Sequence, residues 1–360
     1  MGNIYQSTCS VIPEHMQRHI AEYGDDDARE RIAATLHHTS CLSRQREAAI
    51  ISTASRSLDP QKRRFVYDAR NGHTLPGALV MSEQKESTKD VEAREAFEGA
   101  GATYDFFAKT VSRNSIDDRG MRLVSTIHYE HNFNNAMWNG KQMVFGDGDG
   151  KLFNRFTVSK DVIGHEFAHG VTQFTAALAY HDQPGALNEH ISDAMGMMIK
   201  QKWLALTVMQ SDWQIGRGLF TANVNGTAIR SMKAPGTAYD DPVLGRDPQP
   251  ATMRGYVSSA DDNGGVHINS GIPNFAFFLA ATAVGGYSWP VFTPIWYGVL
   301  TEHLSPEAQF QDFANATVLV AGQLYGAGGK VQLALVDAWS QVGLPVPSAL
   351  TKGALPTAFV

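Results

Sequence analysis

The spacing of apolar and polar residues divides this chain into a front part with the pattern of strands and a rear part with the pattern of helices. In residues 64–150, short apolar runs are broken by turn dipeptides. Asn139-Gly140 separates two such runs in AMWNGKQMVF, which predicts a β-hairpin. From Ser159 onward the apolar positions recur at helical spacing. We expect helices at 90–111, 159–177, 187–206 and 271–284, and two more between 305 and 342.

The first 50 residues have a different character, being polar and rich in His, Arg and Glu. They predict one or two short helices, and the stretch SRSLDPQKRR after them is typical of an exposed, cleavable connector. Strands followed by helices indicate an α+β fold of two lobes. We divide the chain into a front segment, a β-rich N-terminal lobe that includes the helix after Ser159, and a mainly helical C-terminal lobe, at residues 1–50, 51–178 and 179–360.

Composition and charge exclude several classes of protein. Hydrophobic residues make up 43% of the 360 positions, enough for a sizeable core, and the formal net charge of −6 argues against a strongly basic nucleic-acid-binding protein. No apolar run approaches the roughly 20 residues of a membrane-spanning helix. The N-terminus lacks the basic and apolar regions of a secretory signal peptide, so we expect a cytoplasmic protein or one secreted by a leaderless route.

The sharpest chemical signal is the run HEFAH at residues 165–169. On a helix, residues four apart share one face, so both imidazoles can reach one metal ion while Glu166 lies beside a metal-bound water. Two surface histidines are the alternative interpretation, but the apolar neighbours along this helix argue against solvated histidines. Thr172 and Thr175 stand where a zinc protease with a third histidine would place Gly and His, which excludes that class.

A third ligand is expected on the next helical segment, NEHISD at residues 188–193. One interpretation makes Glu189 the third zinc ligand and Asp193 a partner that holds a histidine N–H. The other interpretation places Glu189 and Asp193 in an acidic first turn, whose negative charge interacts favourably with the helix dipole. A catalytic zinc site leaves its fourth position for water, whereas a structural site usually has four protein ligands, so we expect a catalytic site.

With these motifs the chain resembles the thermolysin-like family of zinc metallopeptidases, and more closely its protealysin-like branch. The resemblance runs from about Arg64 to the end. It rests on HYEHNFNNAMWNGKQMVFGDGDG, HEFAHGVTQ, GALNEHISDAMG, AIRSM and DNGGVHINSGIPN, which occur in this order and with compatible spacing. It implies a two-lobed zincin fold in which the active-site helix lies at the floor of a cleft, between the β-rich and the helical lobe.

The resemblance implies the metal site and the base. His165, His169 and Glu189 would bind one catalytic Zn²⁺, and Asp193 would fix His165. Glu166 would be the general base that takes a proton from the zinc-bound water and later delivers it to the leaving amine.

The resemblance also implies groups that stabilise the reacting carbonyl. His267 and Tyr180 would hydrogen-bond the oxyanion, and Asp262 would orient and charge His267. The alternative interpretation is a surface histidine in a Gly-rich turn and a tyrosine that is ordinary packing.

Substrate contacts are implied in the same way. Asn135 and the Ala136 backbone would align the peptide like an added strand, and Arg230 would bind a substrate carbonyl as a bidentate donor. The pocket for the residue after the cleaved bond would be apolar and would favour Leu, Phe or Ile. The alternative is that its residues simply belong to the core. The implied pocket residues are Phe153, Phe156, Val162, Ile215, Leu219 and Ile229.

The chain departs from the family at the position of a double calcium site. Asp161 and Asp212 match two of the calcium-binding positions, but Lys200, Arg217 and Gly218 stand where acidic or calcium-coordinating residues would be. Ca²⁺ needs six or more oxygen ligands, and a local ammonium group repels it. We expect the ammonium group of Lys200 to take the place of the calcium charge at this position, by pairing with Asp161 and Asp212.

The segment CSVIPEHM resembles the short propeptide of protealysin-like enzymes, with Pro13-Glu14 in place of the usual Pro-Pro pair. The resemblance implies that residues 1–50 cover the cleft and are removed by self-cleavage, at a point between Cys41 and about Lys62. Three interpretations of Cys9 stay open. It is a thiolate that caps the zinc, a reduced cysteine packed against its neighbours, or one half of a disulfide with Cys41.

These observations predict a zinc-dependent neutral endopeptidase made as a self-processing zymogen, which cleaves on the N-terminal side of large hydrophobic residues. Its partners would be peptide or protein substrates and its own propeptide, with no nucleic acid and no membrane span. The alternative is a precursor that persists uncleaved and acts inside the cell as a zinc-holding binding or regulatory protein. The complete set of ligands, base and oxyanion donors favours the enzyme.

Overall fold

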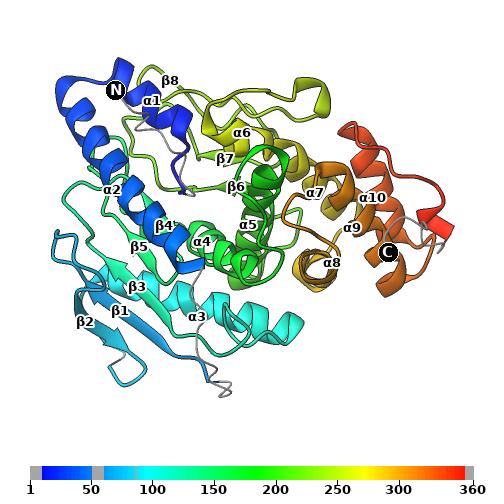
Figure 1. Ribbon diagram of the computed structural model, residues 1–360, viewed down its shortest axis with the longest axis horizontal. Helices are drawn as coiled ribbons and strands as arrows, with labels where there is room; N and C mark the ends of the chain where they lie inside the picture. Colours follow the sequence, from blue (N-terminus) through cyan, green and yellow to red (C-terminus); the bar gives the residue numbers. More distant parts are fainter. Residues whose placement is uncertain (1–9, 51–60, 86, 353–360) are drawn as a thin grey trace.

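The computed structural model describes residues 10–50, 61–85 and 87–352, and it has the two lobes expected of this α+β chain (Figure 1). The N-terminal lobe is built around a five-stranded sheet with the strand order β2-β1-β3-β5-β4. The β1–β3 and β3–β5 pairs are parallel, and the β1–β2 and β4–β5 pairs are antiparallel. The strands are β1 (Arg64–Asp68), β2 (Ala78–Ser82), β3 (Leu123–Ile127), β4 (Ala136–Trp138) and β5 (Met143–Phe145).

Two local signals of this lobe are confirmed. The hairpin at Asn139-Gly140 joins β4 to β5, and the Asn139 side chain accepts hydrogen bonds from the backbone N–H groups of the turn. Helix α3 (Val91–Val111) starts directly after Asp90, whose carboxylate caps it by accepting from the Ala93 N–H at 3.0 Å. α3 packs against the sheet and against the helix that carries the HEFAH run.

The C-terminal lobe is mainly helical, as expected, with two helices that the pattern did not predict, the short α6 and one further helix. That helix, α8, contains Pro290 and Pro294, which normally indicate a break, but Pro290 lies in the first turn, where its missing N–H costs nothing. None of the described helices has both the length and the apolar character needed to cross a membrane. The helices are α4 (Lys160–Gln173), α5 (Asp182–Trp203), α6 (Asp262–Asn269), α7 (Gly271–Val284), α8 (Trp289–Glu302), α9 (Phe310–Tyr325) and α10 (Lys330–Gln341).

Short elements complete the fold between and after these helices. Two small antiparallel pairs, β6–β7 and β8–β9, lie in the connection between α5 and α6. The strands are β6 (Gln214–Ile215), β7 (Arg230–Ser231), β8 (Asp240–Asp241) and β9 (Gly245–Arg246), and single 3₁₀ turns stand at Phe156–Val158, Met253–Gly255 and Leu350–Lys352.

Helices α4 and α5 pack against each other at close range. A Cβ at Gly196 would lie 2.4 Å from the carbonyl oxygen of Asp161, and a Cβ at Gly164 would lie 3.2 Å from the Gly196 Cα. Glycine at both positions therefore lets the two helices approach. This contact brings the HEFAH run of α4 against the NEHISD run of α5, and both runs are buried.

The front segment forms two helices, as expected, and the second of them lies against the N-terminal lobe (Figure 1). Thr39 accepts a hydrogen bond from the side-chain amide of Asn135 at 3.2 Å, and Gln45 accepts one from that of Asn139 at 3.1 Å. The second helix therefore runs alongside β4. Residues 51–60 of the expected connector lie outside the described residues. The two helices are α1 (Glu14–Tyr23) and α2 (Asp26–Ile50).

Candidate active site

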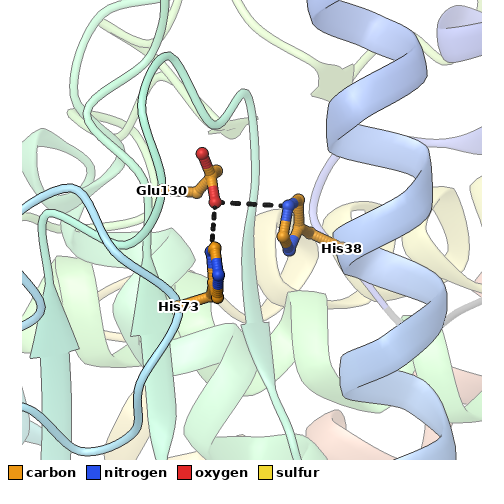
Figure 2. Close-up of side chains that lie close together, drawn as sticks. All are labelled: His38, His73 and Glu130. Atoms are coloured by element: carbon orange, nitrogen blue, oxygen red, sulfur yellow. Dashed lines mark hydrogen bonds and ion pairs between the residues drawn. The ribbon is translucent and has the colours of Figure 1, made fainter.

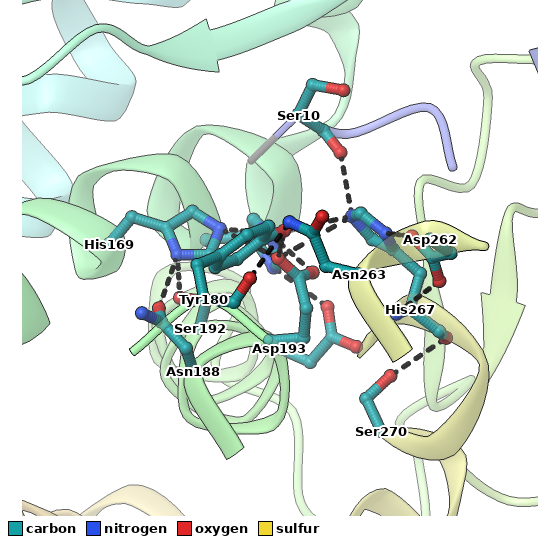
Figure 3. Close-up of polar contacts among 12 residues, drawn as sticks. Ser10, His169, Tyr180, Asn188, Ser192, Asp193, Asp262, Asn263, His267 and Ser270 are labelled. Atoms are coloured by element: carbon teal, nitrogen blue, oxygen red, sulfur yellow. Dashed lines mark hydrogen bonds and ion pairs between the residues drawn. The ribbon is translucent and has the colours of Figure 1, made fainter. Parts of the chain in front are cut away.

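Two histidines on α4 meet at one point of the interior, where α4 faces α5. His165 and His169 are buried, and their Nε2 atoms lie 2.9 Å apart. The Nδ1 of His165 lies 2.8 Å from Asp193 Oδ1, and the Nδ1 of His169 lies 2.8 Å from Asn188 Oδ1 (Figure 3). Because both oxygens only accept, each Nδ1 carries the proton and each Nε2 directs a lone pair at the other.

Glu189 on α5 completes this cluster. Its Oε1 lies 3.4 Å from His169 Nε2, and its Oε2 lies 3.6 Å from His165 Nε2. Glu189 is buried, and its Oε2 has no hydrogen-bond partner among the described residues. Two lone pairs and a buried carboxylate that face one point require a cation there. Two imidazoles and a carboxylate fit Zn²⁺, and three protein ligands leave the fourth tetrahedral position for water.

Glu166 lies beside the same point. Its Oε2 accepts a hydrogen bond from the Trp138 backbone N–H on β4 at 2.7 Å, whereas its Oε1 has no hydrogen-bond partner within the described part of the chain. Burial raises the pKa of Glu166 to about 7, and the neighbouring His165 opposes that rise. A bound Zn²⁺ would act in the same direction as His165. A carboxylate in this range can take a proton from water and return it.

Asp193 joins the zinc cluster to Arg230 on β7. It accepts from the Nε and Nη2 of Arg230 at 3.0 and 2.8 Å and from the Asn274 amide at 2.8 Å. Although burial opposes its ionisation, Arg230 and His165 hold the pKa of Asp193 far below its usual range. Arg230 therefore forms a bidentate pair with Asp193. Its Nη1 has no hydrogen-bond partner among the residues that the structure describes, and the expected contact of Arg230 with a substrate stays a prediction.

His267 on α6 faces the cluster from the opposite side. Its Nδ1 lies 2.6 Å from Asp262 Oδ1, and its backbone N–H donates to Asp262 Oδ2 at 2.8 Å (Figure 3). Burial lowers the pKa of His267, but the carboxylates of Glu189 and Asp262 outweigh burial and raise it to about 9. A protonated ring at this position would have an Nε2–H that can donate to an oxygen that gains negative charge.

A turn of unusual backbone conformation holds Tyr180 next to His267. Residues 262–265, at the start of α6, all have left-handed φ angles, from 50° to 87°. Asn263 in this turn donates its side-chain amide to the Tyr180 carbonyl at 2.8 Å. The Tyr180 hydroxyl lies 3.2 Å from His267 Nε2 and donates to Glu189 Oε1. Both implied oxyanion donors thus lie beside the zinc cluster.

The strand edge formed by Asn135 and Ala136 contacts a segment at the front of the chain itself. The Ile12 N–H donates to Asn135 Oδ1 at 3.2 Å, and the Val11 N–H donates to the Ala136 carbonyl at 3.1 Å. Val11 and Ile12 are completely buried. The contacts that the resemblance implies for a substrate are therefore made by the front segment.

The same segment reaches α6 on the opposite side of the cleft. His267 Nε2 lies 3.2 Å from the Ser10 carbonyl oxygen (Figure 3). The Asp262 N–H donates to Glu14 Oε2 at 3.0 Å, and Arg18 forms an ion pair with Asp261 at 2.7 Å. Ser10 and the first turns of α1 thus lie against both the implied oxyanion donor and the turn that supports it.

The residues implied for the substrate pocket are buried together in the main core, so both interpretations of them remain. The Ile229 N–H donates to the Ile215 carbonyl at 3.0 Å, and the rings of Phe153 and Phe156 lie 5.9 Å apart. A Cβ at Gly216, next to this pair, would contact both Ile229 and Leu219. Their role in substrate selection stays a prediction. All six are at most 1% exposed: Phe153, Phe156, Val162, Ile215, Leu219 and Ile229.

Sequence reasoning missed two groups that orient His169. Asn188 accepts from the His169 Nδ1, and the Ser192 hydroxyl lies 3.0 Å from the same nitrogen. Asn188 and Ser192 are four residues apart in NEHISD, so helical spacing alone would have placed them on one face. The backbone N–H of Trp138, which binds Glu166, carries no side-chain signal at all.

The expected ion pairs of Lys200 are present. Its Nζ lies 2.8 Å from Asp161 Oδ2 and 2.8 Å from Asp212 Oδ1, and it donates to the Gln214 carbonyl at 3.0 Å. Arg217 adds a weaker contact to Asp212 at 3.3 Å. Burial lowers the pKa of Lys200, but the two aspartates outweigh it and raise that pKa above its usual value.

The cysteine interpretations stay predictions. Cys41, on α2, has a free thiol that lies 3.1 Å from an Arg44 guanidinium nitrogen. Cys9 lies outside the described residues, so its three interpretations are not tested.

Comparison with known proteins supports the resemblance. The family model described as thermolysin metallopeptidase, catalytic domain, matches residues 43–173, and the model of its alpha-helical domain matches residues 176–344. An extracellular metalloprotease of Pectobacterium carotovorum subsp. carotovorum is 44% identical over 345 residues, which cover 94% of this chain and 97% of that protein. A thermolysin of Bacillus sp. (strain EA1) is 36% identical over 289 residues, which cover 78% of this chain and 50% of that protein.

A solved structure extends the likeness to the front segment. The precursor of protealysin, a metalloproteinase from Serratia proteamaculans, is 47% identical and superposes with a TM-score of 0.85, covering 93% of this chain and 99% of that one. The two-lobed fold, the buried HEFAH cluster and these matches agree. The chain therefore belongs to the thermolysin family of zinc metallopeptidases and is a zinc metalloendopeptidase.

Proposed function

We propose that this chain is the zymogen of a neutral endopeptidase that cleaves on the N-terminal side of large hydrophobic residues. In this proposal residues 1–50 occupy the cleft until self-cleavage removes them. One observation carries the proposal: Val11 and Ile12 donate hydrogen bonds to Ala136 and Asn135 at the edge of β4, and the Ser10 carbonyl contacts His267. A protease usually holds its substrate along such a strand edge.

The register of this segment supports the proposed specificity. The oxyanion donor of a peptidase contacts the carbonyl of the reacting bond, and His267 contacts the Ser10 carbonyl. Val11 then occupies the position directly after the bond, and its side chain is apolar and completely buried. A dry pocket at this position favours large apolar residues, because burying apolar surface stabilises the complex.

The chemistry follows from the groups around the zinc cluster. Zn²⁺ bound by His165, His169 and Glu189 would polarise a carbonyl and lower the pKa of a bound water to about 7. Glu166, beside this point, would be the group that takes a proton from water and returns it to the leaving amine. His267 and Tyr180 donate to the oxygen that becomes negative, in a buried site where such hydrogen bonds are stronger than in water.

The metal requirement differs between the two ends of α4. We propose Zn²⁺ as the only metal that the active site needs, and we infer that the Asp161–Asp212 position works without calcium. Lys200 already lies 2.8 Å from an oxygen of each aspartate. A calcium ion there would have to displace or approach a buried ammonium group, which costs electrostatic energy.

The relatives also bear on where the enzyme acts. One relative is named an extracellular metalloprotease. We infer that this chain likewise acts outside the cell, and the leaderless route remains a prediction.

An intact-mass time course of the purified chain, with and without 1,10-phenanthroline, tests the proposal. We expect loss of a segment of about 50 residues, together with cleavage of a quenched peptide, and chelator should stop both. A peptide with Leu after the cleaved bond should be hydrolysed at least about tenfold faster than one with Asp there. A stable full-length mass and no turnover, with one zinc per chain, would instead support a persistent zinc-holding precursor.

A further inference from the structure

A second group of metal-ligating side chains lies at the boundary between the front segment and the N-terminal lobe. His38 is on α2, His73 lies in the loop between β1 and β2, and Glu130 follows β3 (Figure 2). Glu130 Oε2 lies 3.2 Å from His38 Nε2 and 2.7 Å from His73 Nδ1. One ligand atom from each residue lies within 4.8 Å of the other two. Three distant segments of sequence therefore converge on one point.

The local structure holds these side chains in place. The Glu130 N–H donates to the Gly72 carbonyl at 3.0 Å, which ties the loop of Glu130 to the loop of His73. Glu130 has a left-handed φ of 54°, and its Oε1 accepts from the His131 N–H at 3.2 Å, so only Oε2 is directed at the histidines. The Tyr129 hydroxyl lies 3.5 Å from the other ring nitrogen of His38. Contacts behind the ligands orient them, as in protein metal sites.

The donor set and its exposure suit a divalent transition metal. Two imidazoles and one carboxylate are the ligands that Zn²⁺ prefers, and they repeat the donor set of the catalytic cluster. The side chains of His38 and Glu130 are 19% and 21% exposed, whereas that of His73 is 67% exposed. The point is thus half-enclosed, with an open side through which an ion can enter and water can complete the coordination.

A third polar cluster, formed by His128, Asp90 and Asp147, differs from this one because its histidine cannot bind a metal. His128 Nδ1 lies 2.8 Å from Asp147 Oδ2, and His128 Nε2 lies 3.0 Å from Asp90 Oδ2. The hydrogen bond to Asp147, with that to Asp90, raises the pKa of His128 to about 10, so both ring nitrogens keep their protons. No lone pair is left for a metal. At His38 and His73, in contrast, each ring uses only one nitrogen on Glu130.

We propose that His38, His73 and Glu130 form a second zinc site, which fastens the front segment to the peptidase. An ion bound by all three ligands favours the docked arrangement over the released one, because the released arrangement loses the His38 ligand. The effect on activation rests on the proposed function, since it requires that the front segment be removed. Zinc bound here slows the departure of that segment after cleavage.

Calorimetric titration of Zn²⁺ into the full-length Glu166→Gln chain, already carrying one equivalent of zinc, tests the site. This variant stays uncleaved, so the result does not depend on activity. We expect a second equivalent to bind and to raise the melting temperature. Adding His38→Gln or His73→Gln should remove both effects. Adding His131→Gln, at an exposed histidine beside Glu130 that lies outside the cluster, should leave both effects unchanged.

Two outcomes would overturn the site. One is a single equivalent of zinc in the Glu166→Gln chain, and the other is a second equivalent that survives both His38→Gln and His73→Gln. His73 lies on an exposed loop, so His73→Gln should keep the melting temperature that the parent has without added zinc. Equal melting temperatures without zinc would show that a loss of zinc binding in His73→Gln is not caused by unfolding.

Release of the front segment from the wild-type chain tests the consequence. Size-exclusion chromatography after self-cleavage separates the bound segment from the free one. Zinc at a level that fills the second site should slow release several-fold, and His73→Gln should abolish this zinc effect. Equal release with and without zinc would overturn the fastening role. If no chain is cleaved at all, the proposed function fails, while the calorimetry still decides whether the site exists.

Discussion

Two charged clusters lie on the same pair of helices, α4 and α5, and they differ in the source of their positive charge. At one cluster, the Nε2 atoms of His165 and His169 and the Glu189 carboxylate face one point, where Zn²⁺ would supply the positive charge. At the other, the ammonium group of Lys200 lies 2.8 Å from both Asp161 and Asp212. A covalently attached cation balances charge as well as an ion does, but it offers no open ligand position. An external metal is therefore kept where water must be activated and is replaced where only charge must be balanced.

Among the variants that test this comparison, Glu166→Gln should have the largest effect on turnover. The amide keeps the shape of the side chain but cannot accept a proton, so turnover should fall by about 10²–10⁴-fold. Glu166 is not one of the three proposed ligands, so zinc content should stay at one per chain. Both chains should be freed of the front segment by the same added protease before turnover of a quenched peptide is measured. Wild-type turnover would remove Glu166 from the mechanism, and loss of zinc would make it a ligand.

Lys200→Met should break the other cluster. It leaves the buried Asp161 carboxylate beside Asp212 with no buried cation between them, and removing one partner of a buried ion pair typically costs about 3–5 kcal/mol. Denaturant unfolding in the Glu166→Gln background measures this loss without self-digestion. Lys202→Met, on the same helix but half-exposed, is the matched control and should change stability by less than about 0.5 kcal/mol.

Added calcium tests whether Lys200→Met loses stability because Lys200 replaces a calcium ion. If Lys200 replaces the ion, millimolar calcium should leave the melting temperature of the parent unchanged and should recover part of the loss in the variant. Stabilisation of the parent by calcium would show that the ammonium group does not substitute for it.

The parts of the site that were predictable from sequence are those set by spacing along one helix. His165 and His169 share a face because they are four residues apart, and the same holds for Glu189 and Asp193. The close contact that brings these two faces together depends on Gly196, which carries no chemical signal of its own. The family resemblance, rather than spacing, supplied that step.

Other features were beyond sequence reasoning because they depend on contacts between distant segments. The resemblance implied that the front segment covers the cleft, but the positions of Val11 and Ile12 follow from hydrogen bonds to Ala136 and Asn135, which leave no periodic pattern. His38 and Glu130 likewise come from separate segments that meet only after folding. Helix α8 was missed for a local reason, since its two prolines indicate a break that packing overrides.

Asp262→Ala should have a smaller effect than Glu166→Gln. Asp262 contacts no ligand of the zinc cluster and acts through His267, which it orients at 2.6 Å. Loss of such a supporting partner typically costs about 10–100-fold. The fall should lie mainly in kcat, because the oxyanion exists only in the transition state, and KM should change little. A fall as large as that of Glu166→Gln would mean that Asp262 takes part in proton transfer itself.

The smallest effect, and the sharpest test of the comparison, is the response of the two clusters to acid. Burial raises the pKa of Asp212, but Lys200 outweighs burial and holds it below the usual value. A carboxyl with a lowered pKa contributes stability that is fully present above its unfolded pKa of about 3.9 and is lost as the pH falls through its lower folded value. The stability difference between the Glu166→Gln parent and its Lys200→Met variant should therefore stay constant from about pH 8 to pH 5 and shrink only below about pH 4.

The zinc cluster should respond at higher pH. Metal-bound histidines must stay unprotonated, and free histidine has a pKa of about 6.5, so acid competes with zinc before it reaches the Lys200 pair. Zinc content measured by mass spectrometry should decline at a pH where the Lys200 contribution to the free energy of unfolding is still intact. If both quantities declined together, the two clusters would be coupled through α4 and α5. The proposed contrast between a removable zinc ion at one cluster and the covalently attached ammonium group of Lys200 at the other would then be wrong.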